Sequence, residues 1–323
     1  MNKKYASLNS IIFQKLTPIL NNDYIFLDLP YFTNIGDTLI WKGTEEFLKT
    51  LPHKCLYRSS IETYSTPRIG KNVTILLQGG GNFGDIWRRH TEFCLRILRV
   101  FPDNQIIVLP QTIYYNNEDI LKQDAQEMTK HKHLTICARD FRSYEILKKQ
   151  FPKNQILQLP DMAFCIGSSF LQKHQIQEED KVLFFKRKDI EFAPYDFSHS
   201  IKHPQTEEHE WPSMEYNLFV NRVLARLKKI QLFMRRRGIP VRLFNKVIDL
   251  YSQNIFMPHM LKIGIQFISK YKYVYSTRLH GAILSILLDK PLTLFDNSYG
   301  KNDCFYQTWL KDTEKVEFIK QSK

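Results

Sequence analysis

The sequence predicts an α/β fold built on a mostly parallel sheet. Short apolar runs alternate with amphipathic segments almost from the N-terminus, an alternation typical of βαβ units. The chain has 323 residues, enough for two domains of ordinary size or one large one, and 43% of the residues are hydrophobic. Gly (12) and Pro (14) are too few for a fibrous or low-complexity chain. A mainly disordered protein is therefore excluded.

Five short apolar runs in the first half are predicted to be strands, because strands covered on both faces are apolar along their length. They are Tyr24 to Leu29, Val73 to Leu77, Ile106 to Leu109, Thr135 to Ala138 and Gln155 to Leu159. Between the second and third runs, residues 85–100 place Ile86, Phe93 and Ile97 on one face. We expect this segment to be a helix packed on the sheet.

A polar stretch over residues 168–180 precedes the next apolar run and is predicted to link two halves. We therefore expect an N-terminal domain over residues 1–172 and a C-terminal domain over residues 173–323. No internal repeat of fixed period relates the halves, so their similarity rests on architecture alone.

The second half begins with a predicted strand, Val182 to Phe185. A polar, His-rich stretch without periodicity follows over residues 189–211 and is predicted to be a long functional loop or a mobile lid. Further strands are expected over residues 241–244, 273–275 and 292–295, and further helices over residues 257–269 and 281–288.

A long helix is predicted over residues 215–237, ended by Gly238 and Pro240. Its apolar residues at helical spacing are expected to form one stripe: Phe219, Val223, Leu227, Ile230 and Met234. The basic cluster at residues 235–237 is best explained as a complement to the helix macrodipole. Contact with an anionic membrane is the second explanation and nucleic acid the third.

Basic residues dominate the charge, since 46 Lys and Arg against 33 Asp and Glu give a formal net charge of +13. This favours an anionic partner: a phosphate-bearing substrate, nucleic acid or an acidic membrane face. No nucleic-acid-binding signature accompanies the basic residues, so nucleic acid is not the expected partner.

The five cysteines are widely spread and form no Cys-x-x-Cys pair, so neither a disulfide framework nor a zinc site is expected. No cluster of carboxylates or histidines in the sequence indicates a metal site, and we expect no cofactor. The N-terminus lacks the pattern of a signal peptide, and no apolar run approaches the roughly 20 residues of a membrane-spanning helix. We expect a cytoplasmic protein that contacts the inner membrane face at most peripherally.

Two glycine-containing turns follow predicted strands of the first half. Residues 78–85 (QGGGNFGD) come directly after one strand and directly before a helix, where backbone N–H groups can approach an anion closely. Their spacing differs from the dinucleotide fingerprint, and a purely structural tight turn is the alternative. The second turn carries Asn34, Gly36 and Asp37, of which Asp37 either caps a helix or serves the site. Both turns are expected to face one cleft, at the carboxyl ends of the strands.

Two segments of the second half carry groups suited to an anionic ligand. Arg278 can grip a carboxylate or phosphate at two points, and His280 is suited to proton transfer near neutral pH. An ion-paired arginine and a capping histidine are the alternative. Residues 295–302 resemble a phosphate cradle, and Arg187 could supply a further guanidinium.

Taken in chain order, these and two further motifs resemble the polysaccharide pyruvyl transferases. The motifs are Asn34-Ile35-Gly36-Asp37, Gly79-Gly80-Gly81-Asn82 with Gly84-Asp85, Arg139 with Ser143 and Glu145, Asp161-x-Ala163-Phe164, Arg278-Leu279-His280-Gly281 and Asp296-Asn297-Ser298-Tyr299-Gly300-Lys301-Asn302. They span about residues 34 to 302, and the ordered set is more specific than any one motif.

The resemblance implies two Rossmann-like domains in a GT-B-like arrangement. It implies phosphoenolpyruvate as donor and a hexose of a glycan or lipid-linked intermediate as acceptor, with a cyclic pyruvate ketal as product. The family's donor-binding arginines and histidine correspond here to Arg187, Arg278 and His280. Residues 189–211 have no pattern that aligns, so acceptor specificity stays open.

Ketal formation needs an acid for C3 of phosphoenolpyruvate, clamps for its anionic groups and a base for the acceptor. We expect His280 to be the acid, with the donor's negative charges helping to hold its proton. The donor is expected to bind Arg187, Arg278, His280, Gly281, Asn297, Ser298 and Lys301. The acceptor is expected to bind Asn34, Gly36, Asp37, Gly80, Gly81, Asn82 and Asp85, with Asp37 or Asp85 as the base.

Two other functions stay open at this point. A GT-B glycosyltransferase that uses a nucleotide sugar in capsule or exopolysaccharide synthesis would share the fold and the phosphate cradles. A non-catalytic basic protein that binds nucleic acid or an anionic membrane would share the charge, and its binding would depend steeply on salt.

Overall fold

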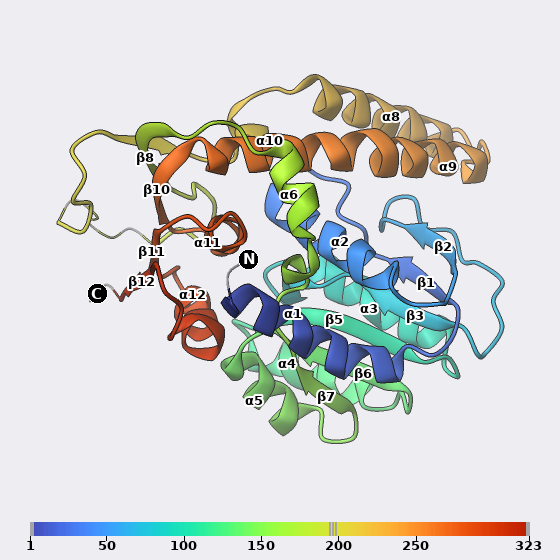
Figure 1. The fold of residues 1–323 in the computed structure, drawn as a ribbon. Coiled ribbons are helices and arrows are strands. Elements are labelled where there is room, and N and C mark those ends of the chain that lie inside the picture. Colours follow the sequence, from blue (N-terminus) through green and yellow to red (C-terminus); the bar gives the residue numbers. More distant parts are fainter. Residues whose placement is uncertain (1–2, 194, 196, 198, 321–323) are drawn as a thin grey trace.

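The computed structural model describes residues 3–193, 195, 197 and 199–320, and it contains two parallel sheets (Figure 1). The first has seven strands in the order β2-β1-β3-β5-β6-β7, with β4 beside β5. The second has five strands in the order β12-β11-β10-β8-β9. This architecture confirms the α/β fold of two Rossmann-like units.

The first sheet is built from residues 24–158. Its strands are β1 (Tyr24–Leu27), β2 (Cys55–Ser59), β3 (Thr74–Leu77), β4 (Gly80–Gly84), β5 (Ile106–Tyr114), β6 (Leu134–Ala138) and β7 (Gln155–Gln158). Its helices are α1 (Lys3–Leu16), α2 (Ile35–Leu48), α3 (Arg88–Val100), α4 (Glu118–Met128), α5 (Phe141–Gln150) and α6 (Ser168–His174). The five predicted strands are all present, whereas β2 and β4 were not predicted.

Neighbouring side chains of each central strand pack into different cores, as the two-residue period of a strand requires. Ile25 and Ile75 face the core formed with α3, α4 and α5. Phe26 and Leu76 face the core formed with α1 and α2. Helices therefore cover both faces of the first sheet.

The second sheet contains β8 (Glu179–Phe185), β9 (Thr206–His209), β10 (Tyr271–Ser276), β11 (Leu292–Phe295) and β12 (Val316–Ile319). Its part of the chain also forms α7 (Pro212–Glu215), α8 (Phe219–Arg236), α9 (Arg242–Tyr251), α10 (Met257–Ser269), α11 (Leu279–Leu287) and α12 (Lys301–Phe305). Leu183 and Val274 of this sheet belong to the same core as Phe26 and Leu76. The two sheets thus share one hydrophobic core.

Two predictions in the second half were wrong, and one predicted helix begins later than expected. The predicted strand at residues 241–244 is the beginning of α9, because so short an apolar run cannot be told from a buried helix turn by periodicity. The predicted helix over residues 215–237 is present as α8, but it begins only at Phe219, and Glu215 belongs to the separate α7. Its predicted apolar stripe is not the buried face, since Phe219 and Ile230 are exposed whereas Val220, Leu224 and Gln231 are buried.

Two other segments also differ from the prediction. The glycine-rich segment is the strand β4, and α3 begins only at Arg88, so no helix N-terminus adjoins the glycines. The polar stretch after residue 168 contains α6 and the start of β8. The predicted loop over residues 189–211 contains β9 and is otherwise largely irregular, and its residues 194, 196 and 198 lie outside the described residues.

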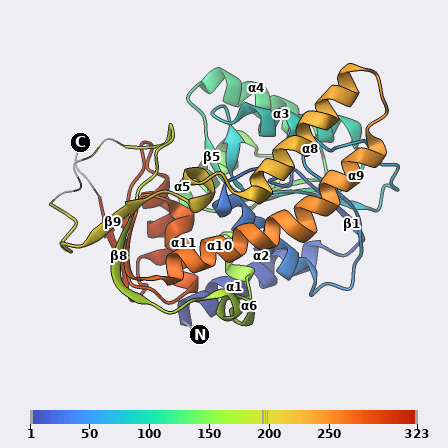
Figure 2. The same ribbon diagram turned by 90° about the horizontal axis from the view of Figure 1, so that it is seen from above.

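Helices α8 and α9 leave the second sheet and lie across the first part of the chain (Figures 1 and 2). Gln231 of α8 donates to the carbonyl oxygen of Glu62 at 3.1 Å, and Asp249 of α9 accepts from the Thr63 hydroxyl at 2.6 Å. Within the described part of the chain, every helix is too short or too polar to cross a bilayer.

Candidate functional site

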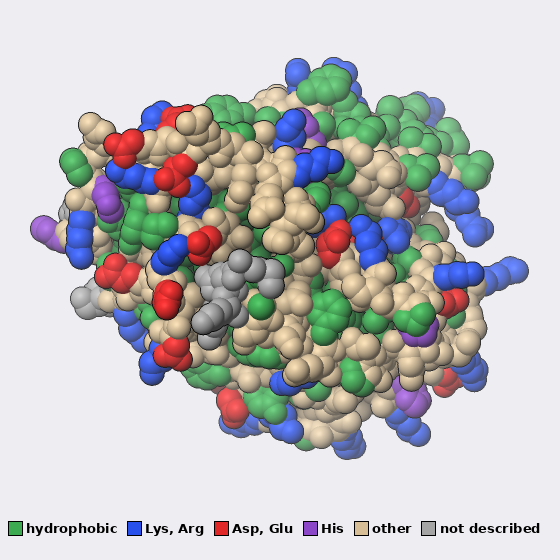
Figure 3. Space-filling view, in the orientation of Figure 1, with side chains coloured by type: hydrophobic (Ala, Val, Ile, Leu, Met, Phe, Trp, Pro, Cys, Tyr) green, Lys and Arg blue, Asp and Glu red, His purple; other side chains and the backbone are tan. Residues whose placement is uncertain are grey.

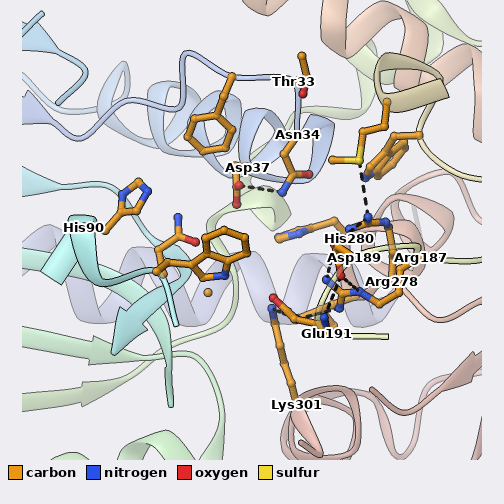
Figure 4. A pocket seen from close by; sticks show the side chains of 17 residues that line it. Thr33, Asn34, Asp37, His90, Arg187, Asp189, Glu191, Arg278, His280 and Lys301 are labelled. Carbon is orange, nitrogen blue, oxygen red and sulfur yellow. Dashed lines mark hydrogen bonds and ion pairs between the residues drawn. The ribbon is translucent and has the colours of Figure 1, made fainter. Parts of the chain in front are cut away.

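A cavity of about 360 Å³ lies between the two halves of the chain (Figure 4). Residues from both halves line it: Phe32, Thr33, Asn34, Asp37, Gly81, Asn82, Trp87, His90, Arg187, Asp189, Glu191, Trp211, Met214, Arg278, Leu279, His280 and Lys301. Many of them follow the carboxyl ends of β1, β8 and β10, where open parallel sheets bind their ligands. The structure therefore brings the predicted turns of the two halves to one cavity.

Asp189 bridges the two arginines that the sequence singles out. Its Oδ1 accepts from Arg187 Nε at 2.8 Å, and its Oδ2 accepts from Arg187 Nη2 at 3.1 Å and from Arg278 Nη2 at 3.0 Å. Burial opposes the charge of Asp189, but the two guanidinium groups outweigh it and lower the pKa of this carboxyl. The bridge marks a position that suits a carboxylate.

Arg278 is the residue before α11 and is held in place by a second carboxylate. Its Nε and Nη2 both donate to the buried Glu210, the Nη2 at 2.5 Å. Among the described residues, Nη1 of Arg278 has no hydrogen-bond partner. Arg278 is thus ion-paired, as the alternative interpretation of the sequence expected. The pairing still leaves one end of the guanidinium facing the cavity.

His280 is held by a buried pair from the first half of the chain. Its Nε2 lies 3.3 Å from Asp161 Oδ2, and the same oxygen accepts from Arg139 Nη1 at 2.7 Å. Burial raises the pKa of Asp161, but the contact with His280 and the charge of Arg139 outweigh burial and hold it well below its usual range. Asp161 is therefore ionised and orients the imidazole.

Lys301 and Arg139 place two cations beside Gly81. A Cβ at Gly81 would lie 2.7 Å from Lys301 Nζ and 3.3 Å from Arg139 Nη2. Arg139 Nη2 is buried without a partner in the described structure, and Lys301 Nζ pairs with Glu191 at 3.3 Å. Burial lowers the pKa of Lys301. An unpaired buried N–H beside a second cation suits an anionic oxygen atom.

The first turn of α2 contacts the second half of the chain directly. Asn34 is the N-cap, since its Oδ1 accepts from Gly36 N at 3.0 Å. Asp37 is therefore not the cap, and its Oδ2 instead accepts from Asn34 Nδ2 at 2.8 Å. A Cβ at Gly36 would lie 2.5 Å from His280 Nδ1. Gly36 thus allows the imidazole to approach α2.

A second histidine faces the cavity and was not predicted. His90 Nδ1 lies 2.9 Å from both carboxylate oxygens of Asp28. Burial lowers the pKa of His90, but the charge of Asp28 outweighs burial and raises it above its ordinary value. Asp28 has a φ of 65°, a left-handed conformation uncommon outside glycine. A histidine oriented by a carboxylate is the usual arrangement of a general base.

The structure does not bring every predicted site residue to the cavity. Asp85, which was expected to be a possible base, does not line the cavity, and it accepts from the backbone N–H groups of Asn116 and Asn117 at 2.9 Å. Gly281 lets α11 pack against Phe185, since a Cβ there would lie 2.4 Å from that ring.

Three more predicted residues support the cavity without lining it. Gly80 has a φ of 142° and lies beside Asp37. Asn297 accepts from Lys301 N at 2.8 Å, which fixes the start of α12. Ser298 is exposed, and its N–H donates to the carbonyl oxygen of Glu191 at 3.2 Å.

Sequence reasoning missed several residues that shape the site. Arg139 and Asp161 appear in the motifs of the resemblance, but neither was assigned a role. Glu191 and Glu210 lie in the stretch without an alignable pattern. Asp28 and His90 are far apart in the chain, so no local spacing signal could have joined them.

Comparison with known proteins identifies the family. The family described as polysaccharide pyruvyl transferase matches residues 34–299 of this chain. The chain belongs to the polysaccharide pyruvyl transferase family. This confirms the resemblance seen in the motifs, and it makes the protein a transferase that acts in pyruvyl transfer to polysaccharide.

Curated relatives agree with this assignment. The chain is 30% identical to the "Putative pyruvyl transferase EpsO" of Bacillus subtilis (strain 168), over 100% of this chain and 97% of the relative. It is 23% identical to "Pyruvyl transferase 1" of Schizosaccharomyces pombe, over 88% of this chain and 69% of the relative. The family members include proteins close to this chain in length.

A solved structure supports the fold. An uncharacterized protein from Klebsiella pneumoniae superimposes with a TM-score of 0.64 at 18% identity, and 99% of each chain is covered. The likeness extends over both sheets, and at this identity it concerns the fold alone.

Proposed function

We propose that this pyruvyl transferase uses phosphoenolpyruvate to form a cyclic ketal on two hydroxyls of a hexose. In this reaction C3 of the donor gains a proton, and C2 forms two bonds to sugar oxygens while its bond to the phosphate oxygen breaks. Of the two protons that the sugar hydroxyls lose, one is matched by the proton that C3 gains, and the other leaves with phosphate. The product carries one added carboxylate.

The observation that carries this proposal is the Asp189 bridge between Arg187 and Arg278. A carboxylate already occupies the position where two guanidinium groups converge. The donor carboxylate would take this place, and Asp189 would leave with its irregular segment. Glu210 would stay and keep Arg278 oriented. We assign the phosphate to Lys301 and to the unpaired Nη2 of Arg139 beside Gly81, since phosphate there would satisfy both cations.

We assign proton transfer to two histidines on opposite sides of the cavity. His280 is the acid for C3, and ionised Asp161 balances the charge of its imidazolium. His90 is our base for the sugar hydroxyl, because Asp28 binds its Nδ1 and leaves Nε2 for the acceptor. Asp37 and Asn34 would then bind sugar hydroxyls, and Trp87 and Phe32 offer aromatic surface to the sugar ring.

These assignments divide the chain into a donor side and an acceptor side. The expected domains, residues 1–172 and 173–323, would bind the acceptor and the donor respectively, except that Arg139 and Asp161 reach across from the first. We place the reaction in the cytoplasm. A polymer and a lipid-linked intermediate both stay candidates for the acceptor.

The test is turnover with labelled phosphoenolpyruvate and a glycan acceptor from the source cells. We expect phosphate release matched by a new ketal methyl signal in the NMR spectrum of the glycan. Labelled nucleotide sugars serve as the comparison, because a glycosyltransferase would use them and leave phosphoenolpyruvate intact. Transfer of sugar without pyruvyl transfer would refute the proposal.

A further inference from the structure

The hairpin of α8 and α9 turns both apolar and polar side chains toward the protein, and Val220, Leu224 and Ile248 are buried in the main core. Gln231 Nε2 donates to Asn245 Oδ1 at 2.6 Å, and both side chains bind backbone carbonyl oxygens of residues 62 and 63. Asn245 is 3% and Asp249 is 8% exposed. These contacts fix which face of each helix points inward.

The outward side of the same hairpin is apolar. On α9, Leu243 is 77% and Leu250 is 60% exposed, and Val247 lies between them at helical spacing. On α8, Phe219 is 68% and Phe233 is 56% exposed. These helices thus expose large apolar side chains in addition to those they bury, whereas a surface helix normally keeps its outer face polar. A soluble protein exposes such a surface where it binds something.

Basic side chains flank this apolar surface, although Lys228 points inward to the carbonyl oxygen of Tyr31 and to Glu62. Between Phe219 and Ile248 the sequence holds nine basic residues and no Asp or Glu: Arg222, Arg226, Lys228, Lys229, Arg235, Arg236, Arg237, Arg242 and Lys246. Figure 3 shows apolar and basic side chains side by side at the upper right, where Figure 1 places α8 and α9. On α8, Arg222, Arg226, Lys229 and Arg236 are all exposed.

We propose that the outward side of the α8–α9 hairpin binds the surface of an anionic lipid bilayer. Apolar side chains flanked by Arg and Lys match the acyl boundary and the anionic headgroups of such a surface. A second copy of this chain fits less well, because a symmetric contact would place like charges against each other. Nucleic acid would satisfy the cations but offers nothing to Leu243 and Leu250.

On this proposal the basic residues at the end of α8 bind anionic lipid headgroups in addition to complementing the helix macrodipole. The proposal concerns binding alone and does not depend on the donor or the acceptor of the reaction.

The experiment is flotation of the full-length protein with vesicles. Vesicles of phosphatidylcholine alone are compared with vesicles in which roughly one lipid in three is phosphatidylglycerol. We expect flotation with the anionic vesicles only, and a marked loss as NaCl rises from about 50 mM to about 500 mM. Flotation that is absent, or equal on both vesicles, would overturn the proposal.

Two independent pairs of substitutions locate the surface. Leu243→Ser with Leu250→Ser removes apolar contact, and Arg236→Gln with Arg237→Gln removes two charges. Each pair should weaken vesicle binding about tenfold. The controls are Ile176→Ser, exposed elsewhere, and Lys148→Gln with Lys149→Gln, which removes two charges from the last turn of α5.

Thermal melting checks that every variant is folded. Equal losses from the controls would overturn the assignment of this surface. Sedimentation gives a further test. If the two leucine substitutions convert a dimer into a monomer while vesicle binding stays unchanged, the proposal is overturned, because a second copy would then cover the hairpin. The membrane proposal would also be refuted if the wild-type protein bound DNA but no vesicles, and if the two arginine substitutions abolished that DNA binding.

Discussion

His280 of the second half lies 3.3 Å from Asp161 of the first half, so the proposed acid is oriented by a carboxylate from the opposite side of the cavity. Asp161 is fully buried and His280 is partly buried, and Arg139 binds the same carboxylate oxygen of Asp161. The relative position of the two halves therefore determines the direction of the imidazole. Any change that separates the halves should affect this contact first.

His280→Gln should lower the rate by roughly a hundred- to ten-thousand-fold while donor binding falls less, as expected when a general acid is lost. Gln retains an N–H donor, so a positioning role would leave most of the activity. Rates measured in heavy water give the check, because a slow proton transfer to C3 produces a solvent isotope effect in the wild type. An active Gln variant with no isotope effect in the wild type would remove His280 from this role.

Asp189→Asn should lower the KM for phosphoenolpyruvate by several-fold, since the donor would no longer compete with a carboxylate for Arg187 and Arg278. Steady-state kinetics over a range of donor concentration measure this. Asp312→Asn, an exposed site that loses the same charge, is the control. A raised KM would mean that Asp189 orients the arginines for the donor.

Arg278→Lys should greatly reduce kcat/KM although it conserves charge. The guanidinium of Arg278 contacts Glu210 at two points and keeps further N–H donors for the substrate, whereas the single ammonium group of Lys cannot do both. The thermal midpoint is measured beside the kinetics, because the contact with Glu210 is buried and its loss lowers stability. Near-normal activity at low phosphoenolpyruvate would show that Arg278 is not a clamp.

Two glycine substitutions should separate binding from folding. Gly81→Ala places a methyl group beside Lys301 Nζ and should raise the KM for the donor with little change in melting temperature. Gly84→Ala would place its Cβ 1.7 Å from the Tyr114 carbonyl oxygen at a φ of 140° and should destabilise the fold by several kcal/mol, on the order of 3. Kinetics and thermal melts on both variants test this, and equal melting temperatures would contradict it.

Asp249→Asn should stabilise the protein above about pH 6 and have little effect near pH 4. Burial raises the pKa of Asp249 to about 6 in the folded chain, so the folded state binds a proton that the unfolded chain releases near pH 4. Folding stability contributed by this group is present below pH 4 and is lost as the pH rises through 6. We expect a gain of about 1–2 kcal/mol at pH 8, discounted for partial exposure. A gain that does not change with pH would rule out titration of Asp249 as its cause.

The sequence by itself determined the α/β class, most strands and the residues that approach the cavity from strand ends. Alternating apolar and amphipathic segments report local burial, and motifs such as Arg278 with His280 keep their chemistry in a few consecutive positions. The position of Arg187 at the end of β8 could be inferred for the same reason.

Only the tertiary structure decided which distant groups pair. Asp28 meets His90, Asp161 meets His280, and Glu210 meets Arg278, although each pair is more than 60 residues apart. It also decided that α9 is a helix and that α8 exposes Phe219, because the buried face of a helix is selected by its neighbours rather than by its own periodicity. Local patterns carry no information about partners that chain folding brings together from far along the sequence.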